Sequence, residues 1–88
     1  MKTILVKVTK RDIENGEPCN CYYCPVALAL HCLKGLNGVA VHEGFVEKWS
    51  AQKQNFIELS LPIRAKRFIK QFDRGNLLKP FSFRLKVP

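Results

Sequence analysis

Residues 24–33 have the sequence Cys-Pro-Val-Ala-Leu-Ala-Leu-His-Cys-Leu, which is apolar at nearly every position. A helix built from this stretch is apolar all round, and such a helix has to be buried on most of its sides. Pro25 suits the first helical position, where its missing N–H costs nothing. The glycines at Gly35 or Asn37-Gly38 are expected to end the helix. The rest of the fold therefore has to cover this helix.

Short segments on both sides of the helix show the period of a β-strand. Near the end of the chain, aromatic or aliphatic side chains alternate strictly with polar ones, as in a half-buried strand. The first residues show a similar alternation of Ile and Val with other residues. We expect strands at Thr3–Val8, Val39–His42, Phe45–Trp49, Asn55–Leu59 and Phe81–Val87.

Two further helices are predicted. Thr9 and Asp12 have a spacing typical of a capping box, which predicts a short helix at Lys10–Asn15. A longer helix opens at Ser60-Leu61-Pro62 and ends before Gly75. Its buried stripe is marked by apolar residues at helical spacing, namely Ala65, Phe68, Ile69 and Phe72.

The predicted order is β-α-β-β-β-α-β, with an extra helical turn after the first strand. The natural packing of these elements is a two-layer α+β domain, with two helices on one mixed or antiparallel sheet. With 88 residues, the chain has room for one domain, so residues 1–88 are expected to form a single domain. A core of this size is limited, and a metal ion, a disulfide or a partner is a common addition.

The composition is that of a globular protein, with 47% hydrophobic and 25% charged residues. Lys7 interrupts the apolar start of the chain, so we expect no signal peptide. No segment approaches the roughly 18 apolar residues that a membrane span needs. These features predict a cytoplasmic protein, in which cysteines serve as metal ligands or free thiols rather than disulfides.

Three cysteines lie within six residues, at Cys19, Cys21 and Cys24. Zinc binds deprotonated soft ligands arranged as a tetrahedron, and the Cys21-x₂-Cys24 spacing matches half of many zinc sites. The sequence therefore predicts a structural zinc ion. Two alternatives stay open. In the first, Cys19 and Cys21 are loop thiols, Cys24 is a buried helix cap and Cys32 is an ordinary core residue. In the second, a disulfide joins Cys24 to Cys19 or Cys21 outside the cell.

The fourth zinc ligand has to come from outside this segment. His31 lies seven residues beyond Cys24, about 10 Å along a helix at 1.5 Å per residue, so the two share an ion only if the helix is distorted. Cys32 follows directly after it. His42, at the end of a predicted strand, is the expected fourth ligand.

The net charge of +8 is concentrated in the last third of the chain. Residues 64–88 contain eight of the 15 Lys and Arg residues, but Asp73 is the single acidic residue there. Such asymmetry indicates an anionic partner, either a nucleic acid or an acidic protein surface, or else a solvated face. The expected partner-binding residues are Arg64, Lys66, Arg67, Lys70, Arg74, Arg84 and Lys86.

No pattern typical of catalysis is found. The sequence contains no Ser/His/Asp set, paired catalytic carboxylates, phosphate-binding glycine loop or dinucleotide fingerprint. Tyr22, Tyr23 and Trp49 could stack on nucleic-acid bases if exposed. Four phenylalanines follow helix and strand periods and are expected in the core, namely Phe68, Phe72, Phe81 and Phe83. We therefore expect a binding protein and no enzyme.

Four segments together resemble a family of small bacterial and phage proteins. They are the CPVALAL helix start at residues 24–30, Leu61-Pro62, the FIKQFDRG segment at residues 68–75, and the closing PFSF at residues 80–83. The resemblance implies the α/β domain described above and no established chemistry. Cys19 and Cys21 depart from many relatives, which suggests that the metal site is a local elaboration.

The resemblance also implies a phage-type role. Phage-borne domains of this size often bind a host protein or nucleic acid, and anti-CRISPR proteins are a prominent class. The leading hypothesis is a zinc-stapled inhibitor of a host defence protein, such as an anti-CRISPR that blocks a Cas nuclease from loading DNA. The alternatives are a basic nucleic-acid-binding regulator and a protein that sequesters an anionic nucleotide.

Overall fold

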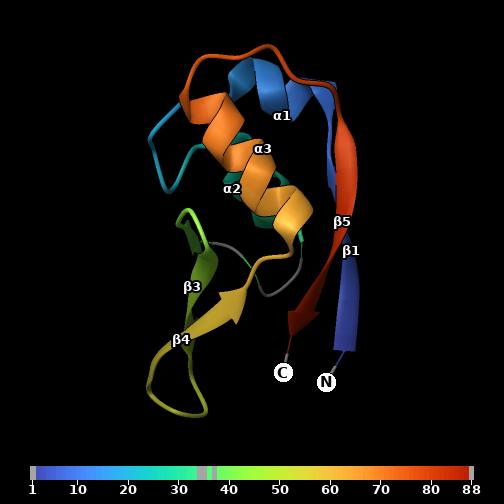
Figure 1. The fold of residues 1–88 in the computed structure, drawn as a ribbon. Coiled ribbons are helices and arrows are strands. Elements are labelled where there is room, and N and C mark those ends of the chain that lie inside the picture. The colour runs from blue at the N-terminus through green and yellow to red at the C-terminus, as the bar shows by residue number, and fades with distance from the viewer. Residues whose placement is uncertain (1, 34–35, 37, 88) are drawn as a thin grey trace.

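The computed structural model describes residues 2–33, 36 and 38–87. Its order of elements confirms the predicted α+β succession, including the short helix after the first strand. The helix from Pro25 is shorter than expected: α2 ends at His31 with Cys32 as its C-cap, before the predicted end at Gly35 or Asn37-Gly38, of which Gly35 and Asn37 lie outside the described residues. In chain order (Figure 1), the elements are β1 (Lys2–Val8), α1 (Lys10–Asn15), α2 (Pro25–His31), β2 (Ala40–Val41), β3 (Phe45–Ser50), β4 (Asn55–Ser60), α3 (Ile63–Asp73) and β5 (Phe81–Val87).

The expectation of one sheet is corrected by the structure. The described strands form two antiparallel sheets, one of β1 and β5 and one in the order β2-β3-β4. Figure 1 shows the long β1–β5 ribbon along the right of the helices and the β3–β4 hairpin below them, at the lower left. The reason is α2, which packs against both β1 and β2. A helix that is apolar all round needs cover on more than one side, and alternation along a strand does not specify its partner.

The buried face of the β1–β5 sheet follows the predicted alternation. Val6 pairs with Phe83 and Ile4 with Leu85. Val6 and Leu85 have no exposed surface, and they join α2 in the core through Val26 and Leu30. Because successive side chains point to opposite faces, the other face of this sheet carries mostly polar residues, with Leu5 exposed among them.

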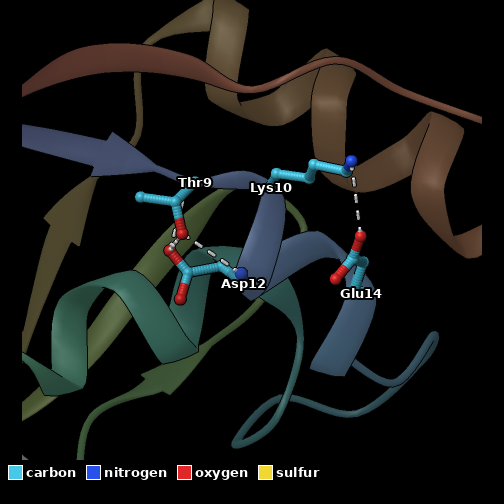
Figure 2. A network of polar contacts seen from close by, with 4 residues as sticks. All are labelled: Thr9, Lys10, Asp12 and Glu14. Atoms are coloured by element: carbon cyan, nitrogen blue, oxygen red, sulfur yellow. Dashed lines mark hydrogen bonds and ion pairs between the residues drawn. The ribbon is translucent and has the colours of Figure 1, made fainter.

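The predicted capping box is present at the start of α1 (Figure 2). The Thr9 N–H donates to Asp12 Oδ2 at 2.9 Å, and the Asp12 N–H donates to Thr9 Oγ1 at 3.2 Å. Lys10 and Glu14 form an ion pair at 3.9 Å across one turn of the same helix. These contacts fix where β1 ends and α1 begins, and so direct the chain toward α2.

Gly16 is the point at which the chain from α1 passes against α2. A Cβ at Gly16 would lie 2.6 Å from Pro25 Cδ and Cγ, closer than real Cβ contacts. We expect Gly16→Ala to lower the free energy of unfolding by roughly 1–3 kcal/mol, because the backbone has to shift to relieve the overlap. Gly44→Ala is the matched control, since a Cβ there meets nothing within 4 Å. Urea unfolding measures both, and equal effects of the two substitutions would contradict the tight approach.

Candidate functional site

The basic residues of α3 form one exposed surface. Ala65, Phe68 and Ile69 are buried, so the other sides of the helix point away from the core at the 3.6-residue period. We call the resulting surface the basic face, which consists of Arg64, Lys66, Arg67, Lys70 and Arg74, all exposed.

The basic face has no acidic partners. Among residues 2–33, 36 and 38–87, the Lys10–Glu14 pair is the one salt bridge. Asp73 is the acidic residue of α3, and its Oδ1 accepts a hydrogen bond of 2.8 Å from the Cys19 N–H instead. The positive field of α3 is therefore free to act on a ligand.

A pocket of about 290 Å³ adjoins the basic face where α3 meets the start of β5. The guanidinium carbon of Arg64 lies 5.9 Å from the ring centroid of Phe81. The Phe81 ring in turn stacks on Phe68, with the centroids 4.6 Å apart. Arg67 and Lys79 also line this aromatic pocket, which therefore combines an aromatic floor with three cations.

The predicted partner-binding set is divided between two surfaces. Phe81, Phe83 and Leu85 of β5 face the core and α3. Arg84 and Lys86 alternate with them and are exposed on the opposite face of the strand. The structure therefore brings together the five cations of α3 and leaves Arg84 and Lys86 apart from them.

The cysteine loop is organised by Asn20 and fastened to β2. The Tyr22 and Tyr23 N–H groups donate to Asn20 Oδ1 at 3.0 and 3.2 Å. The Val41 N–H donates to the Cys21 carbonyl at 2.7 Å. Cys24 caps α2, with its Sγ accepting from the Ala27 N–H at 3.4 Å. The loop thus reaches α2 and β2 through its own backbone and thiol contacts.

A second hollow, of about 170 Å³, lies between this loop and the end of α3, and we call it the thiol pocket. It brings together the three predicted cysteine ligands. It also contains two carboxylates, Glu43 and Asp73, which the sequence analysis did not select. Five of the side chains that line it are of the types that ligate zinc in proteins, namely those of Cys19, Cys21, Cys24, Glu43 and Asp73.

The thiols of this pocket are free and differ in exposure. Cys24 is buried, Cys21 is partly buried and Cys19 is exposed. Burial raises the pKa of the Cys24 thiol, and the charges of Asp73 and Cys21 raise it further, against hydrogen bonds from the Ala27 and Val26 N–H groups that lower it. As they stand, no three His, Cys, Asp or Glu side chains of the described chain are arranged to hold a metal ion.

The other proposed zinc ligands lie elsewhere. Val41 and Glu43 line the thiol pocket, and His42 between them does not. The His42 ring instead stacks on Phe45 with the centroids 4.7 Å apart. His31 Nε2 is 3.3 Å from the Val39 carbonyl oxygen. Cys32 caps the far end of α2 and is exposed, so it is not the core residue that the alternative of ordinary thiols expected, whereas the buried Cys24 cap of that alternative is present.

Two signals in the sequence could have indicated the residues that were missed. Asp73 is the one acid among eight basic residues in the last third, and an isolated charge of this kind often has a specific partner. Phe81 directly follows Pro80 at the start of a strand, so its ring lies at the edge of the core. The Phe81 ring packs against the core, as expected, but it is only partly buried.

None of the described helices is long and apolar enough to cross a membrane.

Comparisons with protein-family models, with curated proteins and with solved structures found no match. The resemblance to small phage and bacterial proteins therefore stays a prediction.

The surroundings of the His42 ring predict how its substitution affects stability. Its Nε2 is buried and has no hydrogen-bond partner in the described structure. We expect His42→Phe to leave the free energy of unfolding unchanged or to raise it by about 1–3 kcal/mol, because an unsatisfied buried polar atom is removed and the stack on Phe45 is kept. His31→Phe should lower it by about 1 kcal/mol, since the contact with the Val39 carbonyl is lost.

Urea unfolding of both variants makes this comparison. A clear loss of stability in His42→Phe would show that the ring makes a bond that the structure lacks.

Proposed function

We propose that the chain binds single-stranded nucleic acid through the basic face and the aromatic pocket. The observation that supports this is the position of Arg64 over the Phe81 ring, within a surface of cations that form no salt bridge to any described residue. Backbone phosphates are attracted by such a surface, and an aromatic floor offers a stacking partner for a base.

The shape of the site favours a single strand over a duplex. Paired bases are stacked inside a double helix, so a pocket with an aromatic floor is used only when a base is unstacked. The cations around the pocket belong to long, flexible side chains, which suit a backbone of variable path. Stacking and phosphate attraction are both sequence-tolerant, so we expect broad rather than sequence-specific binding.

The inhibitor hypothesis stays a prediction. The positive charge of the chain bears on the version in which the inhibitor blocks a Cas nuclease from loading DNA. The channel of a Cas nuclease that receives nucleic acid is positively charged, and so are the basic face and the chain as a whole, at +8. A like-charged surface is repelled from that channel. An inhibitor with this surface would therefore have to bind elsewhere on such a partner.

The phosphate contacts can be tested by changing salt concentration. We expect a fluorescein-labelled oligothymidylate to bind with a steep dependence on salt between about 50 and 200 mM, because counterions are released from the strand. In the double variant Arg64→Gln with Arg67→Gln, the slope of log K against log salt should become shallower by about 1.4, at about 0.7 for each contact with a single strand.

The matched control is Lys2→Gln with Lys53→Gln, which removes the same charge from β1 and from the turn between β3 and β4. Fluorescence anisotropy gives both slopes. Equal slopes in the two double variants would show that binding follows net charge and has no site on α3. If no oligonucleotide binds and a Cas nuclease is inhibited instead, the inhibitor hypothesis is favoured.

The stacking contact requires a separate test. We expect Phe81→Leu to weaken oligothymidylate binding by roughly 5- to 150-fold, since one stacked base contributes about 1–3 kcal/mol. An abasic strand with the same number of phosphates should bind wild type and variant alike. Phe56→Leu is the control, because Phe56 is an exposed ring on β4 that packs on Trp49 instead.

If Phe81→Leu weakens the binding of the abasic strand as much as that of the normal strand, the effect of the substitution is structural. Competition by a nucleoside triphosphate as strong as that of the oligonucleotide would favour nucleotide sequestration over strand binding.

A further inference from the structure

The thiol pocket contains a set of metal-binding side chains from two distant parts of the chain. Three cysteines come from the loop before α2, and Asp73 comes from the last residue of α3, 54 positions after Cys19. The fold brings these groups around one hollow of about 170 Å³. We propose that the thiol pocket binds one zinc ion through Cys19, Cys21, Cys24 and Asp73. This site is separate from the aromatic pocket and does not depend on nucleic-acid binding.

The chemistry of the donors selects the metal. Three thiolates and one carboxylate supply four ligands, which is the number that a structural zinc site uses. Calcium and magnesium prefer sites made of oxygen ligands only, so three sulfur atoms argue against both. A site with no open position for water is structural rather than catalytic.

Asp73 is better placed than the other candidates for the fourth position. Its Oδ1 accepts the Cys19 N–H at 2.8 Å, which fixes the carboxylate beside the loop that carries the thiols. Its second oxygen accepts no hydrogen bond from the described residues and is available to a metal. Ligating carboxylates are commonly oriented by such a second hydrogen bond. Glu43 is exposed, in the bend between β2 and β3, and none of the hydrogen bonds in the described residues fixes its carboxylate, while His42 is stacked on Phe45.

Binding requires the thiols to turn toward one another, because the described side chains are not yet arranged to hold an ion. A cysteine has one side-chain torsion, and a change between its staggered positions moves the sulfur atom without moving the backbone. The loop itself is already held by Asn20 and by the Val41 N–H. The metal would therefore join the loop to the end of α3, and it should stabilise the folded chain by mass action.

The experiment uses the full chain, purified under reducing conditions, treated with chelator and titrated with Co²⁺. Tetrahedral thiolate ligation gives cobalt a visible spectrum and a sulfur-to-cobalt charge-transfer band, and displacement by Zn²⁺ then gives the zinc affinity. We expect one equivalent of metal and a rise in the thermal unfolding midpoint on zinc addition. Asp73→Asn should weaken cobalt binding more than about tenfold, and Cys21→Ser should reduce the charge-transfer band.

Asp73→Asn is a well-matched variant, because an amide oxygen still accepts the Cys19 N–H and only the charged ligand is lost. His42→Phe, Glu43→Gln and Cys32→Ser are the controls, and they should keep the wild-type spectrum and midpoint shift. Absence of stoichiometric cobalt uptake by folded wild-type protein would overturn the site. Loss of binding in His42→Phe, with Asp73→Asn unaffected, would overturn the proposed ligand set.

Discussion

A helix that is apolar on every side has to be covered on every side, and α2 imposes this constraint on the whole chain. Val26, Ala27 and Leu30 have no exposed surface. A fully buried Val or Leu contributes about 1.5–3 kcal/mol relative to an exposed one, so exposure of even one side of α2 would be costly in so small a domain. The β1–β5 sheet covers one side, and β2 covers another. Two small sheets around one helix are therefore the consequence of a single apolar segment.

The same constraint determines where α3 lies and what its sides face. Its apolar stripe adds Ala65, Phe68 and Ile69 to the core formed around α2. One flank then meets β5, where Arg64 lies over Phe81. The other flank meets the cysteine loop, where Asp73 accepts the Cys19 N–H. One helix thus forms a wall of both candidate sites, and the chemistry of each is set by residues at its ends and flanks.

Local patterns predicted the elements of this fold well, because helices and strands differ in period. The strand at Phe81–Val87 and the capping box of Thr9 and Asp12 are present as expected. Which strands pair was not predictable in the same way, because β1 and β5 are joined by contacts between the two ends of the chain. A period says which side chains face the core, but it does not say what lies across from them.

At the candidate site, too, residues that are close in sequence could be predicted together, but residues that packing brings together could not. The three cysteines are neighbours in sequence, and the structure places all of them at one pocket. His42 was selected because it was a conventional ligand at a strand end, yet residues 41 and 43 are the ones that line the pocket. Asp73 could not be selected from spacing, since its distance from the loop depends on how α3 packs. The division of the basic residues between α3 and the far face of β5 also depends on packing.

The charges of the two sites are connected through α3. Three thiolates and a carboxylate bring four negative charges to a zinc ion with two positive ones, so an occupied thiol pocket would be anionic. Lys66 precedes Asp73 by seven residues, which is two turns, so it lies on the same side of α3. Lys66 would then offset the charge of the metal site, whereas Arg64 and Arg67 at the aromatic pocket would stay available to phosphates. A single acidic residue in the basic third can therefore serve a metal site without neutralising the surface proposed to bind nucleic acid.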